Sequence, residues 1–320
     1  MTARQWWLFA AVSVLWGVPY FFIRVAVDAG LSPGFIAFSR VVLGFAVLLP
    51  IALRAGALRG LAARWRWILA YTFFEIAIPF PLIAWGEQRI SSSLTAILIA
   101  SLPLIVALVA IRIDPAERAR GQRLVGLLVG FAGVVALLGF DVAGEPRELA
   151  GAIAVLVATV GYAAGPMIIK HRLRELPPLG PVCASLGVGS LLLAPLAALG
   201  APDEVPGTDA IVAIVVLGIA CTSLAFLAFF ALIAAIGPGR ASVITYVNPV
   251  IAVALGVALL GERPGPAALA GLLLVLAGSW LSTGGRLPPG RGLRRSGARP
   301  PRAAGTAAPA AVPVSPARRS

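Results

Sequence analysis

Residues 91–138 of the chain read SSSLTAILIASLPLIVALVAIRIDPAERARGQRLVGLLVGFAGVVALL, and residues 240–281 read RASVITYVNPVIAVALGVALLGERPGPAALAGLLLVLAGSWL. The two stretches carry the same landmarks in the same order: Pro103 answers to Pro249, and Glu117-Arg118 answers to Glu262-Arg263. Matched prolines and other landmarks lie 145 or 146 residues apart over most of the chain. A nearly constant offset predicts one structural unit that occurs twice.

Composition indicates what kind of unit is repeated. Hydrophobic residues make up 59% of the chain and charged residues 12%, and the mean hydropathy is +0.95. A helix needs about 20 apolar residues to cross a bilayer, because lipid cannot satisfy free backbone groups. The sequence therefore predicts an all-α, polytopic membrane protein with ten transmembrane helices, five in each unit. The ten segments are 6–27, 34–54, 66–86, 91–111, 122–140, 148–169, 180–200, 209–234, 241–260 and 265–283.

The net charge of +13 suggests a nucleic-acid partner until the charges are located. Of the 26 Lys and Arg residues, 21 fall near the N-terminus, in loops after even-numbered helices, or in the tail, and acidic residues gather in the opposite loops. Positively charged loops stay on the cytoplasmic side of a membrane. Both termini are therefore predicted to be cytoplasmic, in the plasma (inner) membrane, and no nucleic acid is expected to bind. Five helices per unit would make the two units inverted repeats.

Three regions follow from this plan. The first five-helix repeat is predicted at 1–140, the second at 141–284, and a disordered, basic cytoplasmic tail at 285–320. The tail is rich in Pro, Gly, Ala and Arg, with too little apolar bulk to fold. The lipid bilayer is the expected surroundings of the two repeats, and attraction of the tail to anionic lipids is an alternative use of its charge.

Proline within a membrane helix removes a backbone hydrogen bond and kinks the helix. Pro103 and Pro249 lie at matching points of the predicted fourth and ninth helices. Paired interruptions of this kind are typical of a transporter's binding site. The predicted substrate pathway includes both prolines and the polar residues beside them, Ser101, Thr245, Tyr246 and Asn248. Kinks that serve packing alone are the alternative.

Two aromatic residues complete the predicted pathway. Trp16 and Tyr162 fall at nearly equivalent positions of the first and sixth helices, each beside a glycine. Aromatic side chains inside a bundle can stack on a substrate, and a purely structural role also stays open for both.

Two ionisable residues lie deep inside their predicted spans, Arg40 in the second helix and Glu75 in the third. An ionisable group at this depth costs about 2.5 to 3.5 kcal/mol on insertion scales, so it is normally paired or faces water. We predict that Arg40 and Glu75 form a buried ion pair. Its role is either a structural lock or a substrate or proton site, and Glu75 is the candidate proton carrier.

Other classes of function find little support. The single histidine, His171, lies at a helix end, and no metal-binding pair, Ser/His/Asp set or ATP-binding motif occurs, so no enzyme, cofactor or metal is expected. Cys183 and Cys221 lie in apolar runs, as buried thiols do. Glycines at helical spacing predict close helix packing, with a homodimer face as the alternative. They are Gly126 with Gly130, and Gly161 with Gly165.

The chain resembles the EamA family of the drug/metabolite transporter superfamily over about residues 6–283. The resemblance rests on the duplicated order of Leu15-Trp16-Gly17, Phe38-Ser39-Arg40, Trp85-Gly86-Glu87-Gln88, the two Pro-containing helices, Leu260-Gly261-Glu262-Arg263 and Leu276-Ala277-Gly278. It implies ten helices, cytoplasmic termini and a central substrate cavity near Trp16, Ser101, Pro103, Tyr162, Tyr246, Asn248 and Pro249. Where the family has Gly-Glu-Arg after the fourth helix, this chain reads Asp114-Pro115-Ala116-Glu117-Arg118, which puts the geometry of that loop in doubt.

The predicted function is therefore that of an inner-membrane secondary transporter. It would export a small organic solute, an amino acid or related metabolite, by alternating access. Multidrug efflux is the main alternative, because a drug site can be mostly apolar, and a non-transporting membrane scaffold is the third.

Overall fold

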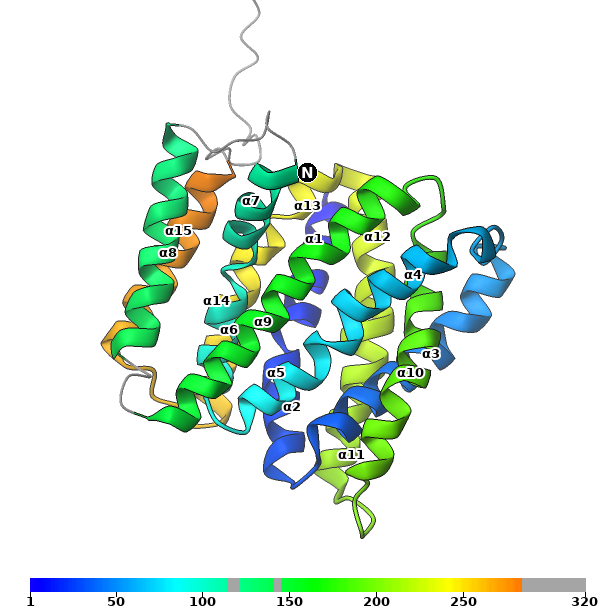
Figure 1. Cartoon of the computed structure of the whole chain (residues 1–320), viewed down its shortest axis with the longest axis horizontal. Helices are drawn as coiled ribbons and strands as arrows, with labels where there is room; N and C mark the ends of the chain where they lie inside the picture. Colours follow the sequence, from blue (N-terminus) through cyan, green and yellow to red (C-terminus); the bar gives the residue numbers. More distant parts are fainter. Residues whose placement is uncertain (114–120, 141–144, 284–320) are drawn as a thin grey trace, which may run out of the picture. The chain divides into compact units, whose positions relative to one another are not determined.

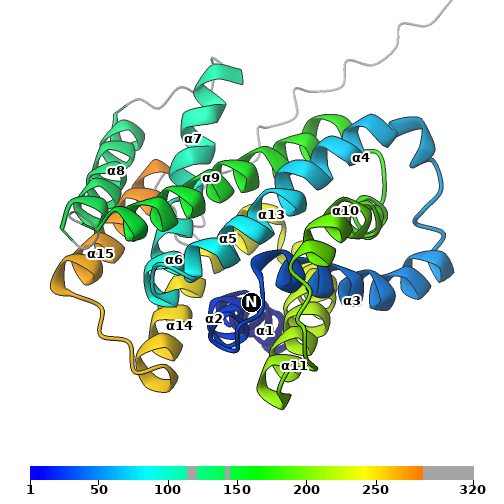
Figure 2. The ribbon, with the colours of Figure 1, turned by 60° about the horizontal axis from the view of Figure 1, so that its bottom comes forward.

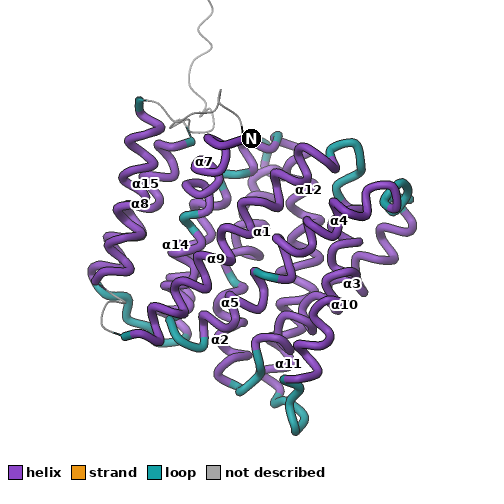
Figure 3. Tube along the Cα trace, in the orientation of Figure 1, coloured by secondary structure: helices purple, strands orange, loops and turns teal. Residues whose placement is uncertain are grey.

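The computed structural model describes residues 1–113, 121–140 and 145–283. The tail predicted at 285–320 and the unusual loop at 114–118 lie outside these ranges. Within them every regular element is helical and none is a strand (Figures 1 and 3). The α-helices are α1 Ala3–Gly17, α2 Pro19–Asp28, α3 Pro33–Arg54, α4 Trp65–Thr72, α5 Pro79–Glu87, α6 Ser92–Ile99, α7 Leu102–Ile113, α8 Gln122–Phe140, α9 Pro146–Ile168, α10 Leu179–Leu199, α11 Thr208–Val215, α12 Ala225–Ile236, α13 Pro238–Ala241, α14 Ile244–Leu259 and α15 Pro266–Ser282.

Eight helical segments are long and apolar enough to cross a membrane, so this is a multi-pass helical membrane protein. They coincide with the first eight predicted segments: Ala3–Asp28, Pro33–Arg54, Ala62–Glu87, Ser92–Val109, Gln122–Gly139, Pro146–Leu173, Leu179–Leu199 and Thr208–Ile236. The predicted ninth and tenth segments coincide with α14 and α15, which are apolar but shorter. Helical segments are therefore found at all ten predicted places, eight of them with the length of a full span.

A π-helical stretch at Phe73–Ala77 interrupts the third span between α4 and α5. Pro79 begins α5 and has no N–H to donate to the carbonyl of Glu75, four residues earlier. The backbone adjusts by donating from Ile78 N–H to the Phe73 carbonyl at 3.1 Å, five residues back. This wider turn changes the direction in which Glu75 leaves the helix.

A second π-helical stretch, Val216–Leu224, joins α11 to α12 in the eighth span. Two hydroxyl groups stabilise it by donating to carbonyls five residues earlier: Thr222 Oγ1 to Leu217 at 2.8 Å, and Ser223 Oγ to Gly218 at 3.1 Å. Ser223 Oγ also lies 3.1 Å from the Gly44 carbonyl of α3. These contacts fix Thr222 against α3.

The two proline-containing helices differ from each other. The fourth span breaks into α6 and α7, and the hydroxyl of Ser101, at the break, donates to the Leu98 carbonyl at 2.6 Å. Pro103 is then the second residue of α7, where a missing N–H is tolerated. Pro249 instead lies inside the uninterrupted helix α14. The predicted matching interruptions are thus a break in one helix and a proline within a continuous helix in the other.

Helices α8 and α15 lie side by side, with glycine on both faces (Figures 1 and 2). A Cβ on Gly133 would lie 3.0 Å from the Gly271 carbonyl oxygen, and a Cβ on Gly278 would collide with the backbone of Gly130. Small residues allow such a close backbone approach in membrane helices. Gly126 and Gly130 therefore serve packing within one chain.

Gly278→Leu is expected to destabilise the protein by at least about 2 kcal/mol, because the added side chain has no space between α8 and α15. Ala277→Leu is the matched control, since Ala277 is exposed on the same helix. Thermal unfolding in detergent, followed by circular dichroism, measures the difference. Equal melting temperatures for the two variants would contradict this packing.

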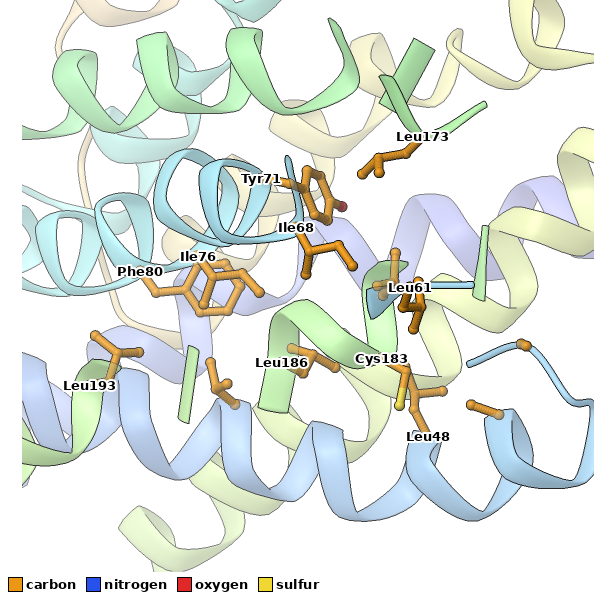
Figure 4. Close-up of a cluster of buried hydrophobic side chains, with 14 of the residues drawn as sticks. Leu48, Leu61, Ile68, Tyr71, Ile76, Phe80, Leu173, Cys183, Leu186 and Leu193 are labelled. Carbon is orange, nitrogen blue, oxygen red and sulfur yellow. The ribbon is translucent and has the colours of Figure 1, made fainter. Parts of the chain in front are cut away.

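A large apolar cluster fills the space between α3, α4, α5 and α10 (Figure 4). Leu48, Ile76, Phe80 and Leu186 belong to it, and Cys183 is a free, buried thiol within it, as predicted. Tyr162 of α9 packs against its edge and also against a second cluster around α2 and α11. The cluster holds Phe80 and Tyr162 in place beside Arg40, which lies between these helices.

Candidate functional site

Arg40 is the deepest charged group of α3, and its side chain is 9% exposed. Its Nε donates to Thr222 Oγ1 at 2.9 Å, so the π-helical stretch Val216–Leu224 supplies its hydrogen-bond partner. The guanidinium carbon lies 4.2 Å from the ring centroid of Phe80, within the range of a cation–π interaction. No described residue accepts a hydrogen bond from its two terminal nitrogens.

Among the described residues the structure shows no salt bridge between Arg40 and Glu75, which the sequence predicts to pair. The salt bridges among the described residues join Arg24 to Asp28 and Arg64 to Glu175, not Arg40 to Glu75. Glu75 points toward α9, where a Cβ on Gly165 would collide with its carboxylate. The prediction rested only on the similar depths of the two residues in the membrane. The π-helical stretch and Gly165 of α9 instead direct the Glu75 side chain toward α9.

Two tyrosines lie within electrostatic range of Arg40, Tyr20 of α2 and Tyr162 of α9. The charge of Glu75 also acts on Tyr162, so this phenol lies within electrostatic range of both ionisable residues. We call Tyr20, Arg40, Phe80, Tyr162 and Thr222 the Arg40 centre. It combines a cation that lacks a carboxylate partner among the described residues with aromatic rings, a combination suited to an organic anion.

Most of the other predicted pathway residues form a separate group on α1 and α14. Trp16 lies 5.8 Å from Phe226 and 4.7 Å from Phe229 between ring centroids. The amide of Asn248, oriented to suit both neighbours, donates to the carbonyls of Ser13 at 3.1 Å and Ile244 at 2.9 Å. Asn248 therefore ties α14 to α1, and Trp16 ties α1 to α12.

The polar side chains beside the prolines form hydrogen bonds within the helix bundle. The Tyr246 hydroxyl lies 2.9 Å from Thr283 Oγ1 and 3.3 Å from the Ser279 carbonyl, which links α14 to α15. Thr245 Oγ1 donates to the Ser242 carbonyl at 2.7 Å. Pro249 is buried, and Pro103 is partly buried. Among the predicted pathway residues, Tyr162 lies within electrostatic range of Arg40 and Glu75. The others take part in contacts within or between helices.

A pocket of about 430 Å³ lies at one end of the bundle, and we call it the end pocket. Its lining is strongly charged and comes from the ends of α2 and α9, from the loop before α6 and from the loop between α14 and α15. The lining includes Arg24, Asp28, Arg89, Ser91, Glu148, Glu262 and Arg263. Sequence reasoning placed these residues in loops or near the ends of predicted helices and did not predict that they gather around one cavity.

Glu262 caps helix α6 across the pocket. Its carboxylate accepts hydrogen bonds from the backbone N–H groups of Ser92 at 2.8 Å and Ser93 at 3.0 Å, and from the Ser93 hydroxyl. Gly261 makes this possible, because its φ of 66° lets the chain turn and return the Glu262 N–H to the Gly256 carbonyl at 3.0 Å. A carboxylate at a helix N-terminus satisfies free N–H groups and favours the helix dipole.

Glu87, the last residue of α5, is fully buried beside this pocket, with 0% exposure. No described residue forms a hydrogen bond with either of its carboxylate oxygens. Sequence analysis singles out Glu87 only as part of the Trp85-Gly86-Glu87-Gln88 motif. The signal that it lies inside is Gly86, whose Cβ would collide with Val155 of α9 and which thus brings α9 close to the end of α5.

Comparison with known proteins agrees with this geometry. The model of the EamA-like transporter family matches the chain twice, at residues 5–139 and 149–284. The chain belongs to the EamA-like transporter family. Its members are membrane transporters, which accounts for a multi-pass helical bundle with a buried polar centre.

Named relatives of this EamA-like chain are also described as transporters. An uncharacterized transporter of Archaeoglobus fulgidus is 27% identical over 87% of this chain and 98% of its own. The uncharacterized inner membrane transporter YedA of Escherichia coli K12 is 26% identical over 79% and 81%. A probable terminal-alkyne amino-acid exporter of Streptantibioticus cattleyicolor is 27% identical over 86% and 92%.

A solved crystal structure shares the fold of this EamA-like protein. It aligns over 88% of this chain and 96% of its own with a TM-score of 0.61, at 19% sequence identity. At that identity the likeness concerns the fold alone.

Proposed function

We propose that this EamA-like protein is a secondary transporter of the inner membrane that exports amino acids or related metabolites by alternating access. The observation that carries the proposal is Arg40, a 9% exposed cation with one hydroxyl partner, one aromatic face and no paired carboxylate among the described residues. A planar guanidinium with free donors suits a carboxylate, which it can hold through two parallel hydrogen bonds. The exporter of Streptantibioticus cattleyicolor supports the same substrate class.

The proposed architecture consists of two inverted five-helix repeats, 1–140 and 141–284, with cytoplasmic termini and a basic cytoplasmic tail at 285–320. Two matches of one family model, at 5–139 and 149–284, support a repeat. The loop charges support the orientation, since 21 of the 26 basic residues lie on one side of the predicted spans or in the tail. The relative YedA supports the inner membrane as the location.

In this proposal the repeats rock about the interrupted helices, and the Arg40 centre opens alternately to each side. The break between α6 and α7 and the proline within α14 support movement of these two helices, which pack against each other. Trp16, Ser101, Pro103, Thr245, Tyr246, Asn248 and Pro249 then belong to the moving helices that line the route. Glu75, close to Tyr162, is the proposed proton carrier.

Counterflow in proteoliposomes tests the substrate class directly. The purified protein is loaded with a mixed pool of amino acids, and exchange of each labelled member is measured with no ion gradient. Each amino acid that exchanges is then challenged by its own decarboxylated amine and by a lipophilic drug cation. Competition by the amino acid but not by the amine supports a carboxylate site. Competition by the drug cation, with no exchange of amino acids, would favour multidrug efflux instead.

Glu75→Gln is expected to leave counterflow intact and to remove its stimulation by a pH gradient, because glutamine keeps the shape of the side chain but has no carboxyl group to bind and release a proton. Uptake with and without the gradient, in wild type and variant, measures the effect. Glu175→Gln is the control, since that carboxylate is exposed and pairs with Arg64. Undiminished gradient-driven transport by Glu75→Gln would rule out the proposed proton role.

A further inference from the structure

Glu87 is among the largest fully buried side chains of the described residues, and it is an acid. Arg24 is close, but its Nη1 donates to the backbone carbonyl of Glu87 at 3.0 Å rather than to the carboxylate. The Arg24 Nε lies 2.9 Å from the carboxylate of Asp28. The carboxylate of Glu87 is therefore enclosed without a hydrogen-bond donor among the described residues.

The charged groups that act on Glu87 come from two elements. Arg24 and Asp28 lie at the end of α2, and Glu262 lies in the loop between α14 and α15, so two negative groups and one positive group act on the carboxylate. Tyr20, also on α2, lies within range of Glu87. An ionised carboxylate in such a site lacks both donors and a free counter-ion, and this state costs several kcal/mol.

The charged groups on the other helices that pack against α5 act on residues other than Glu87. Arg40 of α3 acts on Tyr20, and Arg147 at the start of α9 acts on Arg89. Glu148 of α9 lines the end pocket, and Glu75 precedes α5 by one π-helical turn. At the start of α6 the Ser93 hydroxyl donates to Glu262, and the Ser92 hydroxyl has no hydrogen-bond partner among the described residues.

The carboxylate of Glu262, unlike that of Glu87, accepts three hydrogen bonds, and these hold the α14–α15 loop against α6. These bonds join residues about 170 positions apart in the sequence, so they close this end of the bundle between the two halves. Any movement that opens the end must break them. The same movement takes the Glu262 charge away from Glu87 and admits water to it.

We propose that Glu87 is a proton-binding site that belongs to the closure formed by Glu262 and α6. Glu87 holds a proton while the closure is intact and releases it to water when the end pocket opens. The closed state is then more stable than the open state at low pH, and this difference in stability is lost as the pH rises. The inference uses the alternating access proposed above only to name the movement, and its test requires no substrate.

The test uses a thiol at Ser92, which is 0% exposed and whose backbone N–H remains free to bond to Glu262 after Ser92→Cys. Cys183 and Cys221 are first replaced by alanine, and labelling by a water-soluble maleimide is followed across pH in detergent. The rate is divided by that of Val205→Cys, which is 88% exposed, to remove the intrinsic pH dependence of the thiol reaction. The corrected rate is expected to rise with pH, by up to about tenfold per pH unit, the limit for one proton.

Glu87→Gln in the Ser92→Cys background is expected to flatten this pH dependence, because the amide mimics the protonated acid at every pH. Glu145→Gln, at an exposed carboxylate just before α9, is the matched control and should keep it. Infrared spectra at neutral pH should contain a protonated carboxyl band that Glu87→Gln lacks. An unchanged pH dependence in Glu87→Gln, or the absence of that band in wild type, would overturn the proposal.

The two proposals fail separately. If the counterflow assay finds no amino acid that exchanges, the labelling and infrared results still decide whether Glu87 binds the proton. If amino acids exchange but Glu87→Gln leaves labelling and spectra unchanged, the transport proposal stands and the proton site does not.

Discussion

Arg40→Gln is expected to lower amino-acid counterflow by at least about thirtyfold while the melting temperature stays the same or rises. Removing one member of a buried, hydrogen-bonded charge pair costs at least about 2 kcal/mol, which corresponds to that factor in affinity. In the empty protein, however, the guanidinium has a hydroxyl and an aromatic ring as partners but no carboxylate among the described residues. Replacing it with a neutral amide removes a buried charge and is therefore not expected to destabilise the fold.

The opposite changes in activity and stability separate the two roles considered for Arg40. A structural lock predicts that Arg40→Gln loses stability along with transport, and this result would contradict a substrate role. Arg40→Lys should retain part of the activity, since the charge remains but the planar fork and the stacking on Phe80 are lost. Arg64→Gln, at an exposed pair with Glu175, is the control for a general loss of positive charge.

The positions of the helices could be predicted from the sequence because lipid leaves little choice. Every backbone group must be bonded within the membrane, so an apolar run of the right length becomes a helix. The segment predicted at 34–54 is the helix Pro33–Arg54, and the one at 180–200 is Leu179–Leu199. Helix α14 differs more, since it begins at Ile244 rather than at the predicted residue 241, whereas α15 lies within one residue of its prediction at each end.

The directions of side chains could not be predicted in the same way. Arg40 was correctly placed deep in its helix, but its partner is a threonine that only the π-helical stretch at Val216–Leu224 turns toward it. Glu75 leaves its helix from a second π-helical stretch and meets a glycine of α9. The prediction assumed a regular α-helix at both places. The only sequence signals for the π-helical stretches are Pro79 and the pair Thr222-Ser223.

The candidate sites at the end pocket were missed for another reason. Glu262 was seen as a repeated landmark, and Ser91-Ser92-Ser93 as the start of a helix, but they are separated by about 170 residues. A cap supplied by a distant loop has no local sequence pattern, unlike one supplied by the preceding residue. Glu87 carries even less signal, because a glutamate at the end of an apolar run is ordinarily a solvent-exposed residue.

Glu262→Ala is expected to destabilise the protein by about 2 to 4 kcal/mol and to open the end pocket. Hydrogen bonds to a charged group contribute about 1.5 to 3 kcal/mol each, and the alanine leaves the N–H groups of Ser92 and Ser93 without their acceptor. The Ser93 hydroxyl loses its acceptor as well. Because these bonds hold the α14–α15 loop against α6, their loss should expose a thiol at position 92 at every pH.

Glu262→Gln should fall between wild type and alanine, since its amide oxygen accepts from one N–H while its amide nitrogen faces the other donor. Thermal unfolding measures stability, and maleimide labelling of Ser92→Cys measures opening. Glu145→Ala is the control, because that exposed carboxylate makes no capping bond to α9. If Glu262→Ala melts and labels as Glu145→Ala does, Glu262 does not hold this end closed, and the opening that would free the Glu87 proton must involve other contacts.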